Sequence, residues 1–379
     1  MVVVLAGSGD VTWADGSGRP RQRRRATRRL APMSSRPGAP APLAVVGGWL
    51  CTDLVELSSD LSVLDRDGFW AVVLPYAGPP ICARFADVRP AVPWAGTPWS
   101  GPAPTEWSTT MDETGWSERV ESIRASIEDG DVYQVNLTRR LWAPIDRDAP
   151  GTDVAALGAA LAEGNPAPFS AVIRIPEIGL HIASASPERY LSRDGDEVWS
   201  SPIKGTGATV ADLGPKDVAE NVMIVDLVRN DLGRVCRWGS VEVPTLLDIE
   251  SHPGLVHLVS TVRGTLRDGV GWAEIIDATF PPGSVTGAPK LAACAIIDRL
   301  EVDGRGPYCG AIGWVDADRG RGDLNVAIRT FWMEGERLWL GTGGAITHDS
   351  TAADEWAETE LKARRLLSIA SRSTVRVSS

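Results

Sequence analysis

The sequence lacks the features of several common protein classes. It has only four histidines and no HExxH pattern, which argues against a histidine-bound zinc site. Its five cysteines are scattered, odd in number and without a CxxC spacing, so we expect buried, reduced thiols in a cytoplasmic protein. No apolar run approaches the roughly 18–20 residues that cross a bilayer, and the first residues lack the basic start of a secretory signal. We therefore expect no membrane association.

Nucleotide-binding and nucleic-acid-binding signatures are also missing. No GxGxxG opens a helix after a strand, and there is no GxxxxGK[ST]. Residues 1–40 carry eight arginines in Pro, Gly and Ser-rich sequence, which predicts a disordered basic tail over 1–42. The remainder has 30 basic residues against 47 acidic ones. This excess of acidic residues in the rest of the chain argues against nucleic acid as a partner.

The ordered part of the sequence predicts an α+β fold with large antiparallel β-sheets flanked by helices. Residues 43–112 form a β-rich region followed by a Pro and Trp-rich linker, 113–371 form a catalytic domain, and 372–379 are a tail. Because strands come in hairpin-like groups between long helices, we expect no parallel Rossmann sheet. Two expectations are specific: residues 323–334 form one strand, and the helix over 215–236 has one apolar side. That side comprises Val218, Val222, Val225 and Val228.

Two predicted helices carry carboxylates in suggestive positions. Glu220 lies near the start of the helix over 215–236, and Glu355, Glu358 and Lys362 share one face of the closing helix. Carboxylates without histidine or cysteine neighbours suit a hard cation that keeps its waters, above all Mg²⁺. Taken alone, the same pattern is better explained by solvated helix faces, and the motifs below reverse that preference.

Glycine-rich turns and one arginine indicate where an anion would bind. The stretch FPPGSVTGAPK leads directly into a helix, and GTGGAIT ends a strand where a ligand can approach the backbone closely. Tyr308 and Arg329 lie on neighbouring predicted strands, and Arg329 interrupts apolar sequence. A guanidinium that faces inward needs a carboxylate partner, either from the protein or from a substrate.

Lysine is scarce, with four residues against 34 arginines, and Lys204 lies in the glycine-flanked segment SPIKGTG. It fits three interpretations: a solvated charge, a phosphate clamp or a nucleophile. Glu188 precedes it by 16 residues, a spacing that places both at the ends of adjacent antiparallel strands. A carboxyl group and an amine beside one cleft can act as acid and nucleophile.

Ten stretches in this order resemble the chorismate-utilising enzymes, and within that family the aminodeoxychorismate synthase component I branch. They extend over about 240 residues, and weaker similarity begins near residue 47. The stretches are GDVYQVNLTRR (130–140), SASPERYLS (184–192), PIKGT (202–206), ENVMIVDLVRNDLGRV (220–235), HLVSTVRG (257–264), FPPGSVTGAPK (280–290), YCGAIG (308–313), AIRT (327–330), GTGGAIT (341–347) and AETELKARRLL (357–367).

The resemblance implies roles for individual residues. Glu220 and Glu358 match glutamates that bind Mg²⁺, with Glu355 as a water-mediated ligand, and the ion bridges them to the ring carboxylate of chorismate. Glu188 matches the general acid that helps the carbon-4 hydroxyl leave, and His257 matches a histidine beside that group. The residues that match substrate-binding positions are Tyr308, Arg329, Lys362, Gly343, Gly344 and Thr286.

Two positions separate activities within this family. Members that add water have a lysine base where this chain has Gln134, so the resemblance implies ammonia as the nucleophile. Anthranilate synthases have PIAGT where this chain has PIKGT. In aminodeoxychorismate synthases this lysine forms a covalent adduct at carbon 2, and ammonia then attacks carbon 4 to give 4-amino-4-deoxychorismate for 4-aminobenzoate supply. Lys204 must lose its proton to attack, which arginine cannot do in proteins.

The resemblance also implies a partner, because the chain has no GxCxG nucleophile elbow of a glutamine amidotransferase. We therefore expect ammonia from solution or from a separate glutamine amidotransferase subunit, component II. Two alternatives remain: anthranilate synthase component I or another ammonia-dependent chorismate enzyme, and a non-catalytic scaffold for an amidotransferase.

Overall fold

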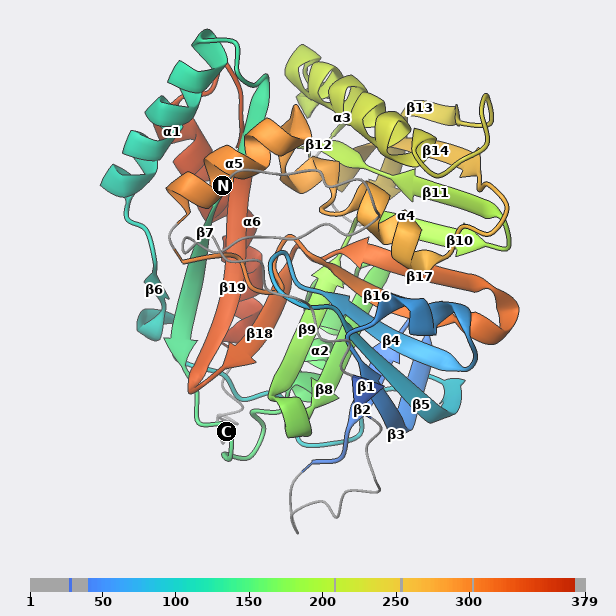
Figure 1. Ribbon diagram of the computed structural model, residues 1–379. Coiled ribbons are helices and arrows are strands. Elements are labelled where there is room, and N and C mark those ends of the chain that lie inside the picture. Colours follow the sequence, from blue (N-terminus) through green and yellow to red (C-terminus); the bar gives the residue numbers. More distant parts are fainter. Residues whose placement is uncertain (1–26, 29–39, 208, 253–254, 302, 372–379) are drawn as a thin grey trace, which may run out of the picture.

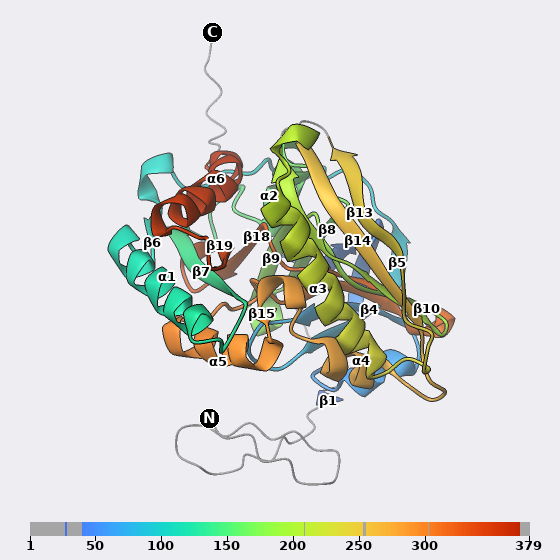
Figure 2. The same cartoon turned by 90° about the horizontal axis from the view of Figure 1, so that it is seen from above.

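The computed structural model of the chain describes residues 27–28, 40–207, 209–252, 255–301 and 303–371 (Figures 1 and 2). Most of the predicted basic tail over 1–42 and the whole of the tail over 372–379 lie outside the described residues. Among the described residues, no helix is long and apolar enough to cross a membrane. All five cysteines are free, and four of them are buried, as the scattered spacing predicted.

The described strands pair into one continuous antiparallel sheet that winds through the whole molecule (Figure 1). From one edge to the other the order is β7, β19, β18, β9, β8, β2, β3, β5, β4, β16, β17, β10, β11, β14 and β13. Strands β6 and β15 pair with β7, β12 continues the line of β11 along β14, and β1 pairs with β3. The predicted fold class is confirmed.

The strand bounds are β1 Thr27–Arg28, β2 Leu43–Val46, β3 Trp49–Ser58, β4 Phe69–Leu74, β5 Ile81–Pro90, β6 Ser108–Thr109, β7 Gln134–Pro144, β8 Phe169–Ile175, β9 Leu180–Ser186, β10 Arg189–Asp194, β11 Glu197–Ser201, β12 Ile203–Gly207, β13 Glu242–His252, β14 Leu255–Thr265, β15 Gly287–Ala288, β16 Ala311–Asp316, β17 Arg321–Val326, β18 Thr330–Glu334 and β19 Arg337–Ile346. The helix bounds are α1 Glu113–Glu128, α2 Val154–Gly164, α3 Pro215–Gly233, α4 Trp272–Thr279, α5 Lys290–Leu300 and α6 Ala352–Ala370.

The helices gather in two groups against the two ends of this sheet (Figure 2). Helices α3 and α4 lie beside the strands from β10 to β14, whereas α1, α5 and α6 lie beside β7 and β19. Helix α2 packs on β8 and β9 and also contacts α6. Helices α3 and α4 cover one hydrophobic cluster of buried side chains, and α1, α5 and α6 cover two others, so the two halves of the molecule meet between α3 and α6.

Two specific expectations are wrong. Residues 323–334 do not form one strand, because β17 ends at Val326, β18 begins at Thr330, and Arg329 between them has a positive φ of 51°. On α3, Val225 and Val228 are buried as expected, but Val218 and Val222 are 39% and 45% exposed. Ile224 and Leu232 are fully buried instead, because α3 turns these residues towards β14.

Candidate active site

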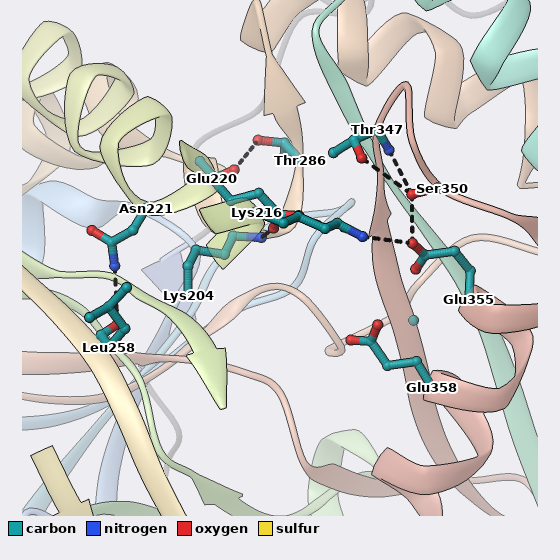
Figure 3. Close-up of polar contacts among 12 residues, drawn as sticks. Lys204, Lys216, Glu220, Asn221, Leu258, Thr286, Thr347, Ser350, Glu355 and Glu358 are labelled. Carbon is teal, nitrogen blue, oxygen red and sulfur yellow. Dashed lines mark hydrogen bonds and ion pairs between the residues drawn. The ribbon is translucent and has the colours of Figure 1, made fainter. Parts of the chain in front are cut away.

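The site assembles from β12 and α3 on one side and β19 and α6 on the other (Figure 3). Helix α3 begins with Gly214 as its N-cap and Pro215 in the first turn, and the Asp217 carboxylate accepts the Gly214 N–H at 2.8 Å. The buried Asn221 side chain fixes this helix on β14, since its amide donates to Leu258 O at 3.0 Å. Glu220, the adjacent residue, is thereby held at the mouth of the space between the two halves.

Lys204 lies on β12 with only 12% of its side chain exposed, and its Nζ is 3.6 Å from Glu220 Oε2. The sequence predicted that Lys204 and Glu188 lie close together. Glu188 is buried in the turn between β9 and β10, near enough to Lys204 for the ammonium to lower the pKa of its carboxyl. The solvated-charge interpretation of Lys204 is excluded by this burial.

Burial raises the pKa of Glu188 to about 7. The Ser284 hydroxyl, the Lys204 charge and the backbone N–H of Ile203 each oppose this rise but do not cancel it. A carboxyl group with such a pKa is protonated in a useful fraction near neutral pH, which is what a general acid requires.

On the opposite side, α6 presents its carboxylates towards α3 (Figure 3). Glu355 is buried, and its Oε1 accepts from Ser350 Oγ at 2.6 Å and pairs with Lys216 Nζ at 3.2 Å. Its other oxygen, Oε2, is buried and has no hydrogen-bond partner among the described residues. Gly344 leaves room for this oxygen, because a Cβ there would lie 2.9 Å from Glu355 Oε2.

The second carboxylate of α6 is paired within its own helix. Glu358 Oε1 is 2.6 Å from Lys362 Nζ, which also donates to Gly343 O at 3.0 Å. Burial raises the pKa of Glu358, but Lys362 and the more distant Lys216 and Lys204 outweigh it, so the net pKa is lowered. Glu358 is therefore an anion at neutral pH.

Burial raises the pKa of Glu220, and the nearby carboxylates of Glu355 and Glu358 raise it further, while Lys204 and Lys216 oppose the rise. Three acidic and three basic side chains thus share one space. Extra positive charge between the carboxylates would relieve their mutual repulsion.

These residues fit a magnesium ion that is bound by few protein ligands. No group of three His, Cys, Asp or Glu side chains among the described residues is close enough to enclose a metal ion. Mg²⁺ commonly binds through one or two carboxylates and completes its shell with water and substrate oxygens. Glu220 and Glu358 supply such carboxylates from two facing helices, and the unpartnered oxygen of Glu355 is available to a metal-bound water.

The predicted carboxylate-binding residues do not lie on neighbouring strands, contrary to expectation. Tyr308 precedes β16, and Arg329 occupies the break between β17 and β18. Within the described part of the chain, no carboxylate lies within ion-pair distance of the half-buried Arg329 guanidinium. Burial and the Arg365 charge lower the pKa of Arg329, so an anionic ligand would be favoured there. The structural salt bridge that the sequence left open for Arg329 is thus not observed among the described residues.

The remaining predicted residues surround the same region. Gln134 starts β7, is fully buried, and has no partner for its amide N or O among the described residues. His257 is buried on β14, opposite Thr206 of β12. The Thr286 hydroxyl is turned towards its own loop, donating to Pro282 O at 3.1 Å, and is buried. Gly341 of β19 leaves room for the Tyr308 ring, which a Cβ would meet at 2.1 Å.

Sequence reasoning missed four residues of this site: Lys216, Asn221, Ser284 and Ser350. Asn221, Ser284 and Ser350 are polar residues that act through buried hydrogen bonds, which no spacing reveals. Lys216 resembled an ordinary charge in the first turn of a helix. The rarity of lysine could have identified it, because the chain has only four lysines and three of them lie at this site.

Comparison with known proteins agrees with this geometry. Residues 95–368 match the model of the chorismate binding enzyme family. The chain is 42% identical over 264 residues to anthranilate synthase component 1 1 of Haloarcula marismortui, which is 66% of this chain and 52% of that protein. It is 37% identical over 275 residues to aminodeoxychorismate synthase component 1 of Escherichia coli K12, 69% of this chain and 59% of that protein. The chain thus spans about half the length of these curated relatives.

Solved structures share the fold. Anthranilate synthase component I from Streptococcus pneumoniae superposes with a TM-score of 0.70 at 23% identity, covering 96% of this chain and 95% of that one. The menaquinone-specific isochorismate synthase MenF from Escherichia coli gives a TM-score of 0.71 at 17% identity, covering 87% and 88%. The family model covers well over half of the sequence, and the chain therefore belongs to the chorismate binding enzymes.

Proposed function

We propose that this chain is an aminodeoxychorismate synthase component I, which converts chorismate and ammonia to 4-amino-4-deoxychorismate for 4-aminobenzoate supply. The observation that carries the proposal is Lys204, a largely buried amine that pairs with Glu220 and whose charge lowers the pKa of the Glu188 acid. Relatives bearing this name support it, at 37% identity in Escherichia coli and 44% over 266 residues in Streptomyces pristinaespiralis, where the match covers 66% of this chain and 36% of that protein.

The substrate would bind between the two halves of the molecule. Its carboxylates would meet the Lys362 ammonium, the backbone at Gly343 and Gly344, and the Arg329 guanidinium, which has no carboxylate partner among the described residues. When bound at Glu220 and Glu358, with Glu355 acting through water, Mg²⁺ would hold the ring carboxylate and neutralise negative charge. The described side chains exclude bulk water from Lys204 and Glu188, which are both largely buried.

The chemistry at carbon 4 then follows in two displacements. The neutral Lys204 amine bonds to carbon 2 as both ring double bonds shift and the carbon-4 hydroxyl leaves as water, with its proton from Glu188. Glu188 recovers a proton from the newly bonded nitrogen. Ammonia next bonds to carbon 4 and both double bonds shift back. The Lys204 nitrogen, reprotonated by Glu188, leaves carbon 2 as the neutral amine, and the new ammonium group returns a proton to Glu188. Chorismate and ammonia thus give the amino product and water.

The two displacements explain why a lysine is required. The incoming nitrogen reaches carbon 4 only because the first displacement moved both ring double bonds. A chain with alanine at this position would deliver ammonia to carbon 2. A relative from Haloarcula marismortui at 42% identity is named anthranilate synthase component 1 1. Anthranilate synthase activity is therefore the second candidate.

Product analysis separates the two candidates. Purified protein is incubated with chorismate, Mg²⁺ and an ammonium salt, and the products are identified by chromatography and mass spectrometry against carbon-2 and carbon-4 amine standards. We expect the carbon-4 amine from the wild type and at least about 100-fold less of it from Lys204→Ala. A carbon-2 amine from the wild type would refute the proposal.

We further propose that ammonia comes from a separate glutamine amidotransferase subunit, because the chain carries no GxCxG elbow and its relatives are named component 1. We place the enzyme in the cytoplasm, consistent with its free cysteines. Glutamine-dependent turnover on adding such a subunit, with none from glutamine alone, tests this proposal.

A further inference from the structure

Lys216 connects the two halves of the site. It lies in the first turn of α3, and its Nζ is 3.9 Å from Glu220 Oε1 on the same helix. The same Nζ is 3.2 Å from Glu355 Oε1 on α6. Among the described residues, Lys216 is the cation that pairs with carboxylates of both helices, and Figure 3 shows its side chain reaching across the gap between them.

The carboxylates that pair with Lys216 are far more buried than Lys216 itself. Side-chain exposure is 13% for Glu220 and 3% for Glu355, but 50% for Lys216. Glu355 is fixed from behind by the Ser350 hydroxyl. The lysine is therefore the movable partner, because its four-carbon stem can rotate into water while the two carboxylates stay in place.

An ammonium and a divalent cation cannot both occupy this gap, since like charges at such a separation repel strongly. Equally, the two carboxylates repel each other when no cation lies between them. Glu220 and Glu355 are therefore two fixed carboxylates, and the mobile Lys216 ammonium fills the position between them that a metal ion would take.

We propose that Lys216 is an internal counter-ion that ties Glu220 to Glu355 and is displaced into solvent when a divalent cation binds between α3 and α6. The inference rests on the magnesium site of the proposed function and adds to it a residue that opposes metal binding. Lys216 neutralises the two facing carboxylates in this scheme while no metal ion lies between them. It also sets the metal affinity, since the ion must compete with the ammonium.

The test is a titration of Mg²⁺ into Lys216→Met by isothermal calorimetry, with no chorismate present. Each half-exposed ion pair contributes up to about a fivefold factor, so losing both competing pairs should tighten Mg²⁺ binding by about 5- to 20-fold. Arg229→Met is the matched control, because Arg229 lies on the same helix, is 51% exposed and pairs with Asp226. It removes one positive charge away from the site, and we expect its Mg²⁺ affinity to stay within about twofold of the wild type.

Mass spectrometry after brief reductive methylation gives a second readout on the wild type. The four lysines are easily resolved, and Lys290, which pairs with Asp231 at 2.5 Å, serves as the internal reference. Labelling of Lys216 relative to Lys290 should rise when Mg²⁺ is added, because the side chain moves into water. A merely structural salt bridge would leave this ratio unchanged.

The outcomes separate this proposal from the one it rests on. Suppose that the wild type binds Mg²⁺ with a heat that Glu220→Gln abolishes, while Lys216→Met binds Mg²⁺ with unchanged or weaker affinity. This result would overturn the counter-ion role but would leave the metal site standing. If neither the wild type nor Lys216→Met binds Mg²⁺, the proposed metal site fails and the counter-ion role fails with it. Tighter binding in Lys216→Met and increased labelling of Lys216 would support the proposal.

Discussion

Removing the Ser284 hydroxyl should move the pH dependence of the reaction without removing any reacting group. Ser284 donates to the Glu188 carboxylate and lowers its pKa, against the larger effect of burial, which leaves that pKa at about 7. A hydrogen bond to a charged group contributes about 1.5 kcal/mol, and one pKa unit corresponds to about 1.4 kcal/mol. Ser284→Ala should therefore raise the pKa of Glu188 by about one unit, to about 8.

The direction of the shift follows from the role of the acid. Glu188 acts in its protonated form, so the part of kcat/KM for chorismate that depends on this acid falls as pH rises through its pKa of about 7. In Ser284→Ala this fall should begin about one pH unit higher. The same sign applies to folding: because the pKa is raised in the folded state, the stability linked to this proton is present at low pH and lost as pH rises through 7.

The assay is chorismate consumption from pH 5.5 to 9 at constant free ammonia and saturating Mg²⁺. Ser284→Thr, which keeps a hydroxyl, is the control and should retain the wild-type profile. Difference infrared spectroscopy of the Glu188 carboxyl, identified by its loss in Glu188→Gln, gives a readout that is independent of turnover. A profile that stays in place or moves to lower pH in Ser284→Ala would show that this hydroxyl does not stabilise the ionised acid.

Two further predictions concern the metal carboxylate and the fold. Glu220→Ala should reduce Mg²⁺-dependent chorismate consumption by at least about 100-fold while leaving the circular dichroism spectrum intact, and retained turnover would contradict the metal role. Arg305→Met should lower the free energy of unfolding in urea by about 3–5 kcal/mol, because it strands the buried Glu301 carboxylate, whose partner Nε lies 2.7 Å away. Arg305→Met combined with Glu301→Met should recover part of that loss, and a single-variant loss below about 1 kcal/mol would contradict the reasoning.

The sequence predicted the long elements well and the irregular ones poorly. Helices α1 and α6 follow from periodicity, because each buries one regular face, whereas strands β7 and β19 are buried on both faces over most of their length. Strand β13 was not predicted, since it contains a proline and charged residues and is largely exposed along its outer side. The apolar side of α3 was misplaced because Val218 and Val222 are exposed, and packing against β14, rather than valine spacing, determines the buried side.

For the site, the sequence identified the residues that match family motifs, but it did not predict which of them form hydrogen bonds or ion pairs with one another. The sequence indicated that Glu188 and Lys204 lie together, and the structure places them within electrostatic contact. The break at Arg329 was not predictable from an apolar strand pattern, because a positive φ at a single non-glycine residue leaves no mark in that pattern. The bridge from Lys216 to Glu355 joins residues 139 positions apart, a separation beyond any local pattern.

That separation has a consequence for how the enzyme becomes active. The Lys204 side of the site forms with β12 and α3, but Glu355, Glu358 and Lys362 arrive only with α6, the last helix of the described chain. Contacts between distant segments are slow to form, because the entropy of closing a long loop is lost before they stabilise the fold. During synthesis from the ribosome, the site can therefore be completed only after nearly the whole domain has emerged. Folding intermediates in which α6 has not yet docked would therefore be compact but would have no catalytic activity.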